Sequence, residues 1–169
     1  GQDVTAAVAY LRDNGVSRIG ALGLSLGGEV LLASAADEPE LRAIVADGAT
    51  YHSLADYLEL PENRSLWRSW TTRVMYASTA LFSGQRPPER TLLESISQAA
   101  DTKFLLIAAG TKPNESAYGA LYETAANGRA ELWTVPNAGH TLGLFVAPEE
   151  YRSRVLAFFQ DALSDTGGR

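Results

Sequence analysis

The chain has 169 residues, a formal net charge of −6, 46% hydrophobic residues and no cysteine. This size and apolar content favour one domain with a substantial core, and the acidic balance argues against a nucleic-acid partner. The lack of cysteine excludes a disulfide, a thiolate metal site and a cysteine nucleophile, and no apolar run approaches the roughly 18 residues of a membrane span.

The composition leaves the cellular location open. Our first expectation is a soluble protein of the cytoplasm. The sequence begins with Gly1 and not with methionine, so a signal peptide or an anchor upstream of it stays an alternative.

Hydrophobic periodicity predicts a helix over residues 3–14, followed by a strand over 17–24. The helix would bury one face, which carries Val4, Ala7, Val8 and Leu11. The strand is apolar almost without alternation, which indicates burial on both faces of a parallel sheet. A helix to about Asp37 and a second short strand over 41–46 complete a βαβ unit.

Residues 51–100 interrupt this alternation, and we interpret them as a helical insertion or lid over the sheet, with a loop over 83–88. Its apolar residues have helical spacing. They include Trp67, Trp70, Met75, Leu81 and Phe82. The segment could line an acyl-side substrate pocket, to which Trp67, Trp70 and His52 would belong, or it could be an ordinary packed helix.

The alternation then returns. The expected elements are a strand over 103–109, a helix over 115–126, a strand over 130–135, a final helix over 148–163 and a frayed tail over 164–169. The final helix would bury Tyr151, Val155, Leu156, Phe158 and Phe159. The predicted fold class is therefore α/β, with a parallel sheet of about four strands, flanking helices and the helical insertion.

The segment Gly23-Leu24-Ser25-Leu26-Gly27-Gly28 lies between the first strand and the helix that follows it. A serine on such a sharp strand-to-helix turn needs small neighbours, and Gly23 and Gly27 would remove the Cβ atoms that clash there. The serine would then lie at a helix N-terminus, where a backbone N–H can stabilise an oxyanion. Ser25 is thus a candidate nucleophile.

A serine nucleophile needs a base, and the chain has two histidines, His52 and His140. His140 follows the fourth strand, so it lies at the carboxyl edge of the sheet together with Ser25. His52 opens the helical insertion, which makes it a weaker candidate for the base. His140 is the predicted base.

The Ser25 motif, followed far downstream by Gly139-His140 before a final amphipathic helix, resembles the α/β-hydrolase family. The resemblance covers nearly the whole chain, from the helix before the serine to the terminal helix. It implies a partial fold, because about four strands of that family's sheet would precede the first helix. We therefore expect a C-terminal portion of a longer hydrolase, with its own N-terminal half as a partner.

The same resemblance implies a triad acid in the loop after the third strand, where Glu115 is the only carboxylate. Asp47, at the end of the second strand, is the alternative acid, since some relatives place it there. The backbone N–H of Leu26 would bind the oxyanion, and the family's second donor has no counterpart in this chain.

These features predict a serine hydrolase that cleaves a small-molecule carboxylic ester, thioester or amide through an acyl-enzyme, without metal or cofactor. Two alternatives stay open. One is a non-catalytic binding scaffold of the same fold, and the other is an acyltransferase that uses the same triad.

Overall fold

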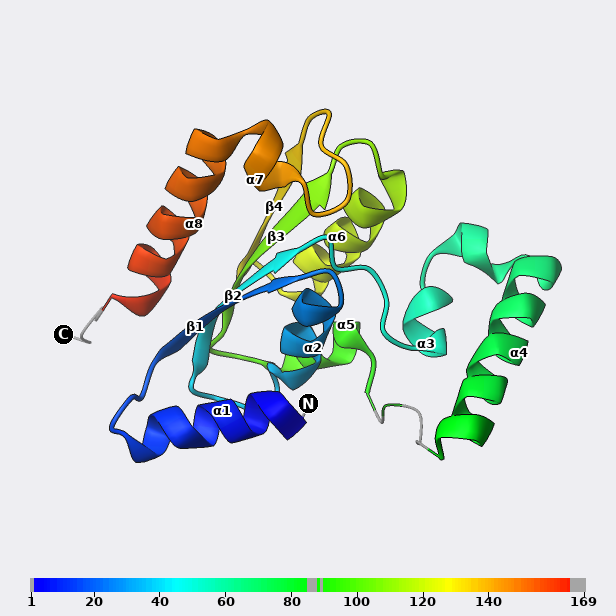
Figure 1. The fold of residues 1–169 in the computed structure, drawn as a ribbon, viewed down its shortest axis with the longest axis horizontal. Helices are drawn as coiled ribbons and strands as arrows, with labels where there is room; N and C mark the ends of the chain where they lie inside the picture. Colours follow the sequence, from blue (N-terminus) through cyan, green and yellow to red (C-terminus); the bar gives the residue numbers. More distant parts are fainter. Residues whose placement is uncertain (1, 85–87, 89, 165–169) are drawn as a thin grey trace.

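A computed structural model describes residues 2–84, 88 and 90–164. At its centre is a four-stranded sheet in the order β1-β2-β3-β4, in which every pairing is parallel. The strands are β1 (Ile19–Leu24), β2 (Leu41–Asp47), β3 (Lys103–Ala109) and β4 (Ala130–Val135). The predicted class and the number of strands are confirmed, and Figure 1 shows helices on both sides of the sheet.

Two apolar clusters lie on opposite faces of the sheet. The larger cluster joins Ile44 and Leu106 to the helices α1 (Gln2–Asp13), α2 (Leu26–Ser34), α5 (Leu92–Gln98) and α6 (Pro113–Ala125). The smaller cluster joins Val45 and Leu105 to α8 (Pro148–Leu163). The central strands β2 and β3 are therefore buried on both faces, as continuous apolar strands of a parallel sheet should be.

Strand β1 does not follow the prediction of burial on both faces. Leu22 is 43% exposed and Leu24 is 50% exposed, although Ile19 and Gly23 are buried. The reason is topological, because β1 is the edge strand and α8 packs mainly over β2. An apolar sequence alone does not reveal whether a strand has a neighbour on its second side.

The region between β2 and β3 divides into two parts. Helix α5 begins with a capping box of Thr91 and Glu94 and packs on α2 and α6, so it belongs to the core. The short helices α3 (Leu54–Tyr57) and η1 (Pro61–Arg64) carry α4 (Leu66–Ser83), which stands away from the sheet in Figure 1. Gly84 caps the end of helix α4, and 85–87 of the expected loop lie outside the described residues.

Smaller differences concern the ends of the chain. Leu156 is 60% exposed and Ala7 is also exposed, so neither belongs to the predicted buried face of its helix. A short helix α7 (Gly143–Val146), which the periodicity did not indicate, precedes α8. Residues 165–169 of the expected tail lie outside the described part. No helix in the described ranges combines the length and the apolar character needed to cross a bilayer.

The close approach of β1 and α2 makes different demands on the two glycines that flank Ser25. A Cβ on Gly23 would lie 2.4 Å from the carbonyl carbon of Gly27, whereas a Cβ on Gly27 would meet nothing within 4 Å. The expectation that both glycines are needed for space is thus wrong for Gly27. Only the strand residue is in contact with backbone that cannot yield.

We expect Gly23→Ala to lower the free energy of unfolding by about 1–3 kcal/mol or more, because overpacking against backbone forces the turn to shift. Gly27→Ala is the matched control, with an expected change within about 0.5 kcal/mol. Urea denaturation of both variants measures the difference. Equal destabilisation would contradict this account of the turn.

Candidate active site

Ser25 lies between β1 and α2 in a backbone conformation that L-residues rarely adopt, with φ 51° and ψ −121°. The N–H of Ser25 donates to the carbonyl oxygen of Asp47 at a distance of 2.7 Å. The carbonyl of Ser25 accepts the first hydrogen bond of α2, from the N–H of Glu29. The side chain of Glu29 in turn accepts from the N–H and hydroxyl of Thr50, each at 3.1 Å. The strained turn is thus bonded to the segment that includes the end of β2.

His140 lies in the loop after β4, and its Nε2 is 2.9 Å from the Ser25 hydroxyl oxygen. Its side chain is 43% exposed, so the hydroxyl–imidazole pair is open to solvent. The imidazole also packs against Gly48, where a Cβ would lie 2.9 Å from Cε1 of the ring. A residue with a side chain at position 48 would displace the imidazole.

Glu115 lies in the first turn of α6 and is 3% exposed. One carboxylate oxygen is 2.8 Å from Nδ1 of His140, and the other accepts from the N–H of Ala109 at 2.9 Å. The positive end of the helix dipole favours a carboxylate at this place. Both oxygens are thus held, and the carboxylate faces the imidazole of His140.

The loops that carry the histidine and the glutamate are bonded to each other. The N–H and the hydroxyl of Thr111 both donate to the carbonyl of Ala138, at 3.1 Å and 2.8 Å. The N–H of Gly110 donates to Val135. These contacts hold His140 and Glu115 as one unit at the carboxyl ends of β3 and β4.

Comparison with known proteins supports this architecture at the level of solved structures. No protein-family model matches the chain, and no curated protein matches it. An esterase of Pyrococcus furiosus is 24% identical with a TM-score of 0.64, and the match covers 96% of this chain and 61% of the esterase. The chain adopts part of the α/β-hydrolase fold.

Further structures of this fold agree. The α/β hydrolase GrgF of a Penicillium species is 16% identical with a TM-score of 0.66, over 95% of this chain and 70% of GrgF. MenH of S. aureus is 13% identical with a TM-score of 0.64, over 95% of this chain and 74% of MenH. The chain spans less than two thirds of the length of the esterase. At these low sequence identities the similarity shows the fold alone.

Asp47, the alternative acid, lies close to Ser25 and His140 but its side chain bonds elsewhere. Its carboxylate accepts from the hydroxyl of Tyr151, at 2.9 Å, and is 2% exposed. Burial raises the pKa of the Asp47 carboxyl above its usual range, and nearby Glu115 acts in the same direction, whereas Tyr151 and His140 oppose it. In this structure Nδ1 of His140 pairs with Glu115, and Asp47 pairs with Tyr151.

The remaining predicted site residues lie apart from this arrangement. His52 lines a separate cavity with Ser34 and Asp37, near the end of α2 opposite to Ser25. Trp67 and Trp70 stack on one another on α4, with ring centroids 6.1 Å apart, and both are exposed. The contacts of the described residues do not join these side chains to Ser25, His140 or Glu115.

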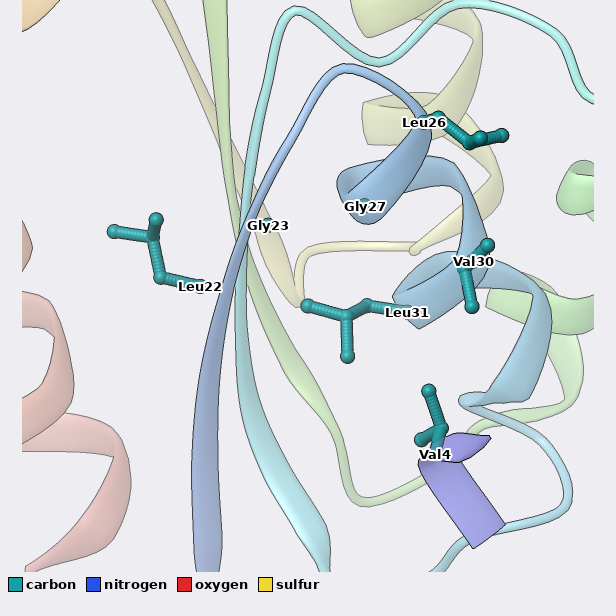
Figure 2. A pocket seen from close by; sticks show the side chains of 7 residues that line it. All are labelled: Val4, Leu22, Gly23, Leu26, Gly27, Val30 and Leu31. Carbon is teal, nitrogen blue, oxygen red and sulfur yellow. The ribbon is translucent and has the colours of Figure 1, made fainter. Parts of the chain in front are cut away.

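The residue singled out for the oxyanion, Leu26, is the first residue of α2, where helical N–H groups have no partner within the helix. Beside it an open apolar cavity of about 410 Å³ lies along the edge strand. Figure 2 shows its lining residues, which are Val4, Leu22, Gly23, Leu26, Gly27, Val30 and Leu31. The turn that carries Ser25 thus borders an apolar surface.

Sequence reasoning missed two residues of this site, Gly48 and Tyr151. In the sequence, the pair Asp47-Gly48 indicates only a turn. In the structure Gly48 has φ 72°. Tyr151 was assigned to the apolar face of its helix, and its ring does pack against Trp133. No local signal indicates that its hydroxyl reaches a carboxylate 104 residues away. Among the described residues, no cluster of His, Asp and Glu has the makeup of a metal site.

The raised pKa of Asp47 predicts a pH-dependent stability. The folded state favours the protonated carboxyl of Asp47. The stability that this carboxyl contributes is therefore fully present below its ordinary pKa, and it is lost as the pH rises through the pKa of the folded state. Asp47→Asn keeps an oxygen for Tyr151 and removes the charge. We expect its Tm to exceed that of the wild type at pH 8, where each 1 kcal/mol corresponds to about 2–4 °C.

The gain should shrink towards pH 4, where the wild-type carboxyl is increasingly neutral in both states. Differential scanning calorimetry across this range measures it. A gain that is independent of pH, or that grows on acidification, would show that the charge of Asp47 is not the cause.

Proposed function

We propose that the chain carries the nucleophile, base and acid of a serine hydrolase. The observation that supports this most is the hydrogen-bonded line from Ser25 through His140 to Glu115, at 2.9 Å and 2.8 Å. The three side chains come from the ends of three different strands, and 115 residues separate the serine from the histidine. Nucleophile, base and orienting carboxylate in this order match the geometry of acyl transfer through a triad.

In the proposed reaction, the Ser25 hydroxyl attacks the carbonyl carbon of a carboxylic ester, thioester or amide. Nε2 of His140 accepts the hydroxyl proton as the bond forms and returns it to the leaving group. A water molecule, deprotonated by the same nitrogen, then attacks the acyl carbon. The bond from that carbon to the Ser25 oxygen breaks, Nε2 returns the proton to this oxygen, and the acid is released. The proton on Nδ1 points to Glu115 throughout, and its carboxylate stabilises the imidazolium.

The backbone of the nucleophile turn would stabilise the developing oxyanion. The N–H of Leu26 begins α2, so it combines a hydrogen-bond donor with the positive end of the helix dipole. One donor of this kind is typically worth about 10²–10³ in turnover. We propose that a second donor comes from a segment that pairs with the outer edge of β1. This segment would belong to the N-terminal half of the hydrolase, which would extend the sheet there.

An activated serine should react with a fluorophosphonate probe. We expect labelling of the full-length protein, and its loss in Ser25→Ala and in His140→Ala, because the first removes the nucleophile and the second its base. Ser97→Ala is the matched control, since Ser97 lies exposed on α5 and its hydroxyl bonds to Glu94. Gel fluorescence and intact mass spectrometry measure the adduct.

The outcomes separate the candidate functions. Persistent labelling of the Ser25→Ala variant would contradict the nucleophile assignment. No labelling of a folded wild type would favour the non-catalytic scaffold. Labelling followed by transfer of an acyl group to an added alcohol in preference to water would favour the acyltransferase.

The roles of the two carboxylates can be ranked by substitution. Glu115→Gln should lower kcat by about 100-fold or more, because the neutral amide no longer stabilises the imidazolium. Asp47→Asn should cost less than about tenfold, since that side chain bonds to Tyr151 and not to the base. Hydrolysis of p-nitrophenyl acetate measures both. The reverse ranking would assign the acid to Asp47.

A further inference from the structure

Helix α4 turns its least apolar side towards the body of the protein. The residues of α4 that are partly buried are Ser69, Thr72, Tyr76 and Ala80, which are spaced three and four apart. This side faces α3 and η1, the elements that α4 contacts most. A surface helix of a globular protein normally turns its apolar stripe inward. Here the orientation is the reverse.

The outward side carries the large apolar residues, whose exposed fractions lie between 46% and 91%. They are Leu66, Trp67, Trp70, Val74, Met75, Leu81 and Phe82, which we call the α4 face. Leu66, Trp70, Val74 and Leu81 form its central stripe at helical spacing. So many exposed large side chains on one element indicate a surface that is covered in function.

Three hydroxyl groups of this helix that lie among its exposed residues are bonded within it. Thr71 donates to the carbonyl of Trp67 at 3.1 Å, and Ser78 donates to that of Val74 at 2.7 Å. Thr79 donates to Met75 in the same way, at 3.0 Å. Because these hydroxyls have acceptors inside the helix, the α4 face can leave water without the cost of unsatisfied polar groups.

The charge of α4 is unlike that of the chain. Its sequence, LWRSWTTRVMYASTALFS, contains Arg68 and Arg73 and no acidic residue, although the whole chain has a net charge of −6. Arg73 is exposed. A cationic helix of this kind is complementary to an anionic surface. In a two-fold contact through this helix, two cationic copies of it would face each other.

We propose that the α4 face docks on a bilayer that contains anionic phospholipids. The helix would lie in the plane of the interface, with its tryptophans at the level of the headgroups and the exposed Arg73 near the lipid phosphates. With 18 residues, α4 extends about 27 Å along that plane. This occupant accounts for the exposed apolar residues, the internally bonded hydroxyls and the positive charge together.

Vesicles of ether-linked phosphatidylcholine, with and without ether-linked phosphatidylglycerol, test the proposal. Ether lipids contain no acyl ester, so the result does not depend on the proposed hydrolase activity. We expect the wild type to co-sediment with the anionic vesicles and its tryptophan emission to shift to the blue, since two of its three tryptophans lie on the α4 face. Each arginine should contribute about fivefold to the partition coefficient.

The substitutions lie on exposed positions and should leave the fold intact, which circular dichroism checks. The Trp67→Ser/Trp70→Ser variant should lower the partition coefficient at least about tenfold. Arg73→Ser should lower it about fivefold, and only for anionic vesicles. Leu156→Ser is the control, because this leucine is 60% exposed but lies on α8.

Two results would overturn the proposal. One is co-sedimentation that is absent, or that the double tryptophan variant does not change. The other is a dimer in sedimentation velocity that the same variant dissociates, which would assign the α4 face to a contact between copies.

Discussion

The hydrogen bonds of one imidazole are the contacts on which the candidate site depends. The imidazole of His140 joins Ser25, which follows the edge strand β1, to Glu115, which follows β3. The loop of His140 itself follows the opposite edge strand, β4. The side chains must therefore meet across the carboxyl end of β2. The two residues at the end of β2 make this meeting possible. The carbonyl of Asp47 anchors the serine backbone, and Gly48 leaves room for the imidazole ring.

Much of the fold could be predicted because parallel strands that are buried on both faces have a simple sequence pattern. The pattern succeeded for β2 and β3, and the apolar runs gave β1 and β4 their correct places. The prediction that β1 is buried on both faces was wrong, because the exposure of this strand follows from its position at the sheet edge and not from its own residues. Helix α4 shows the same limit, since spacing reveals an apolar stripe but not whether it points to the core.

The candidate site divides in the same way. Ser25, His140 and Leu26 were singled out by a local motif and its place in the chain, and the structure brings the serine and histidine together. The choice between Glu115 and Asp47 could not be derived from local sequence, because it depends on Tyr151 in the last helix. A hydrogen bond over such a separation leaves no trace in the residues around either partner.

The connections of the site are unequal, and this has a consequence for its dynamics. The loops of His140 and Glu115 bond to each other through Thr111 and Ala138, above two strands that are paired along their length. Ser25 instead follows a strand with one paired edge among the described residues. Unless a further segment pairs with that edge, local opening would begin at β1 and separate the hydroxyl from the imidazole, while the imidazole–carboxylate pair remained assembled.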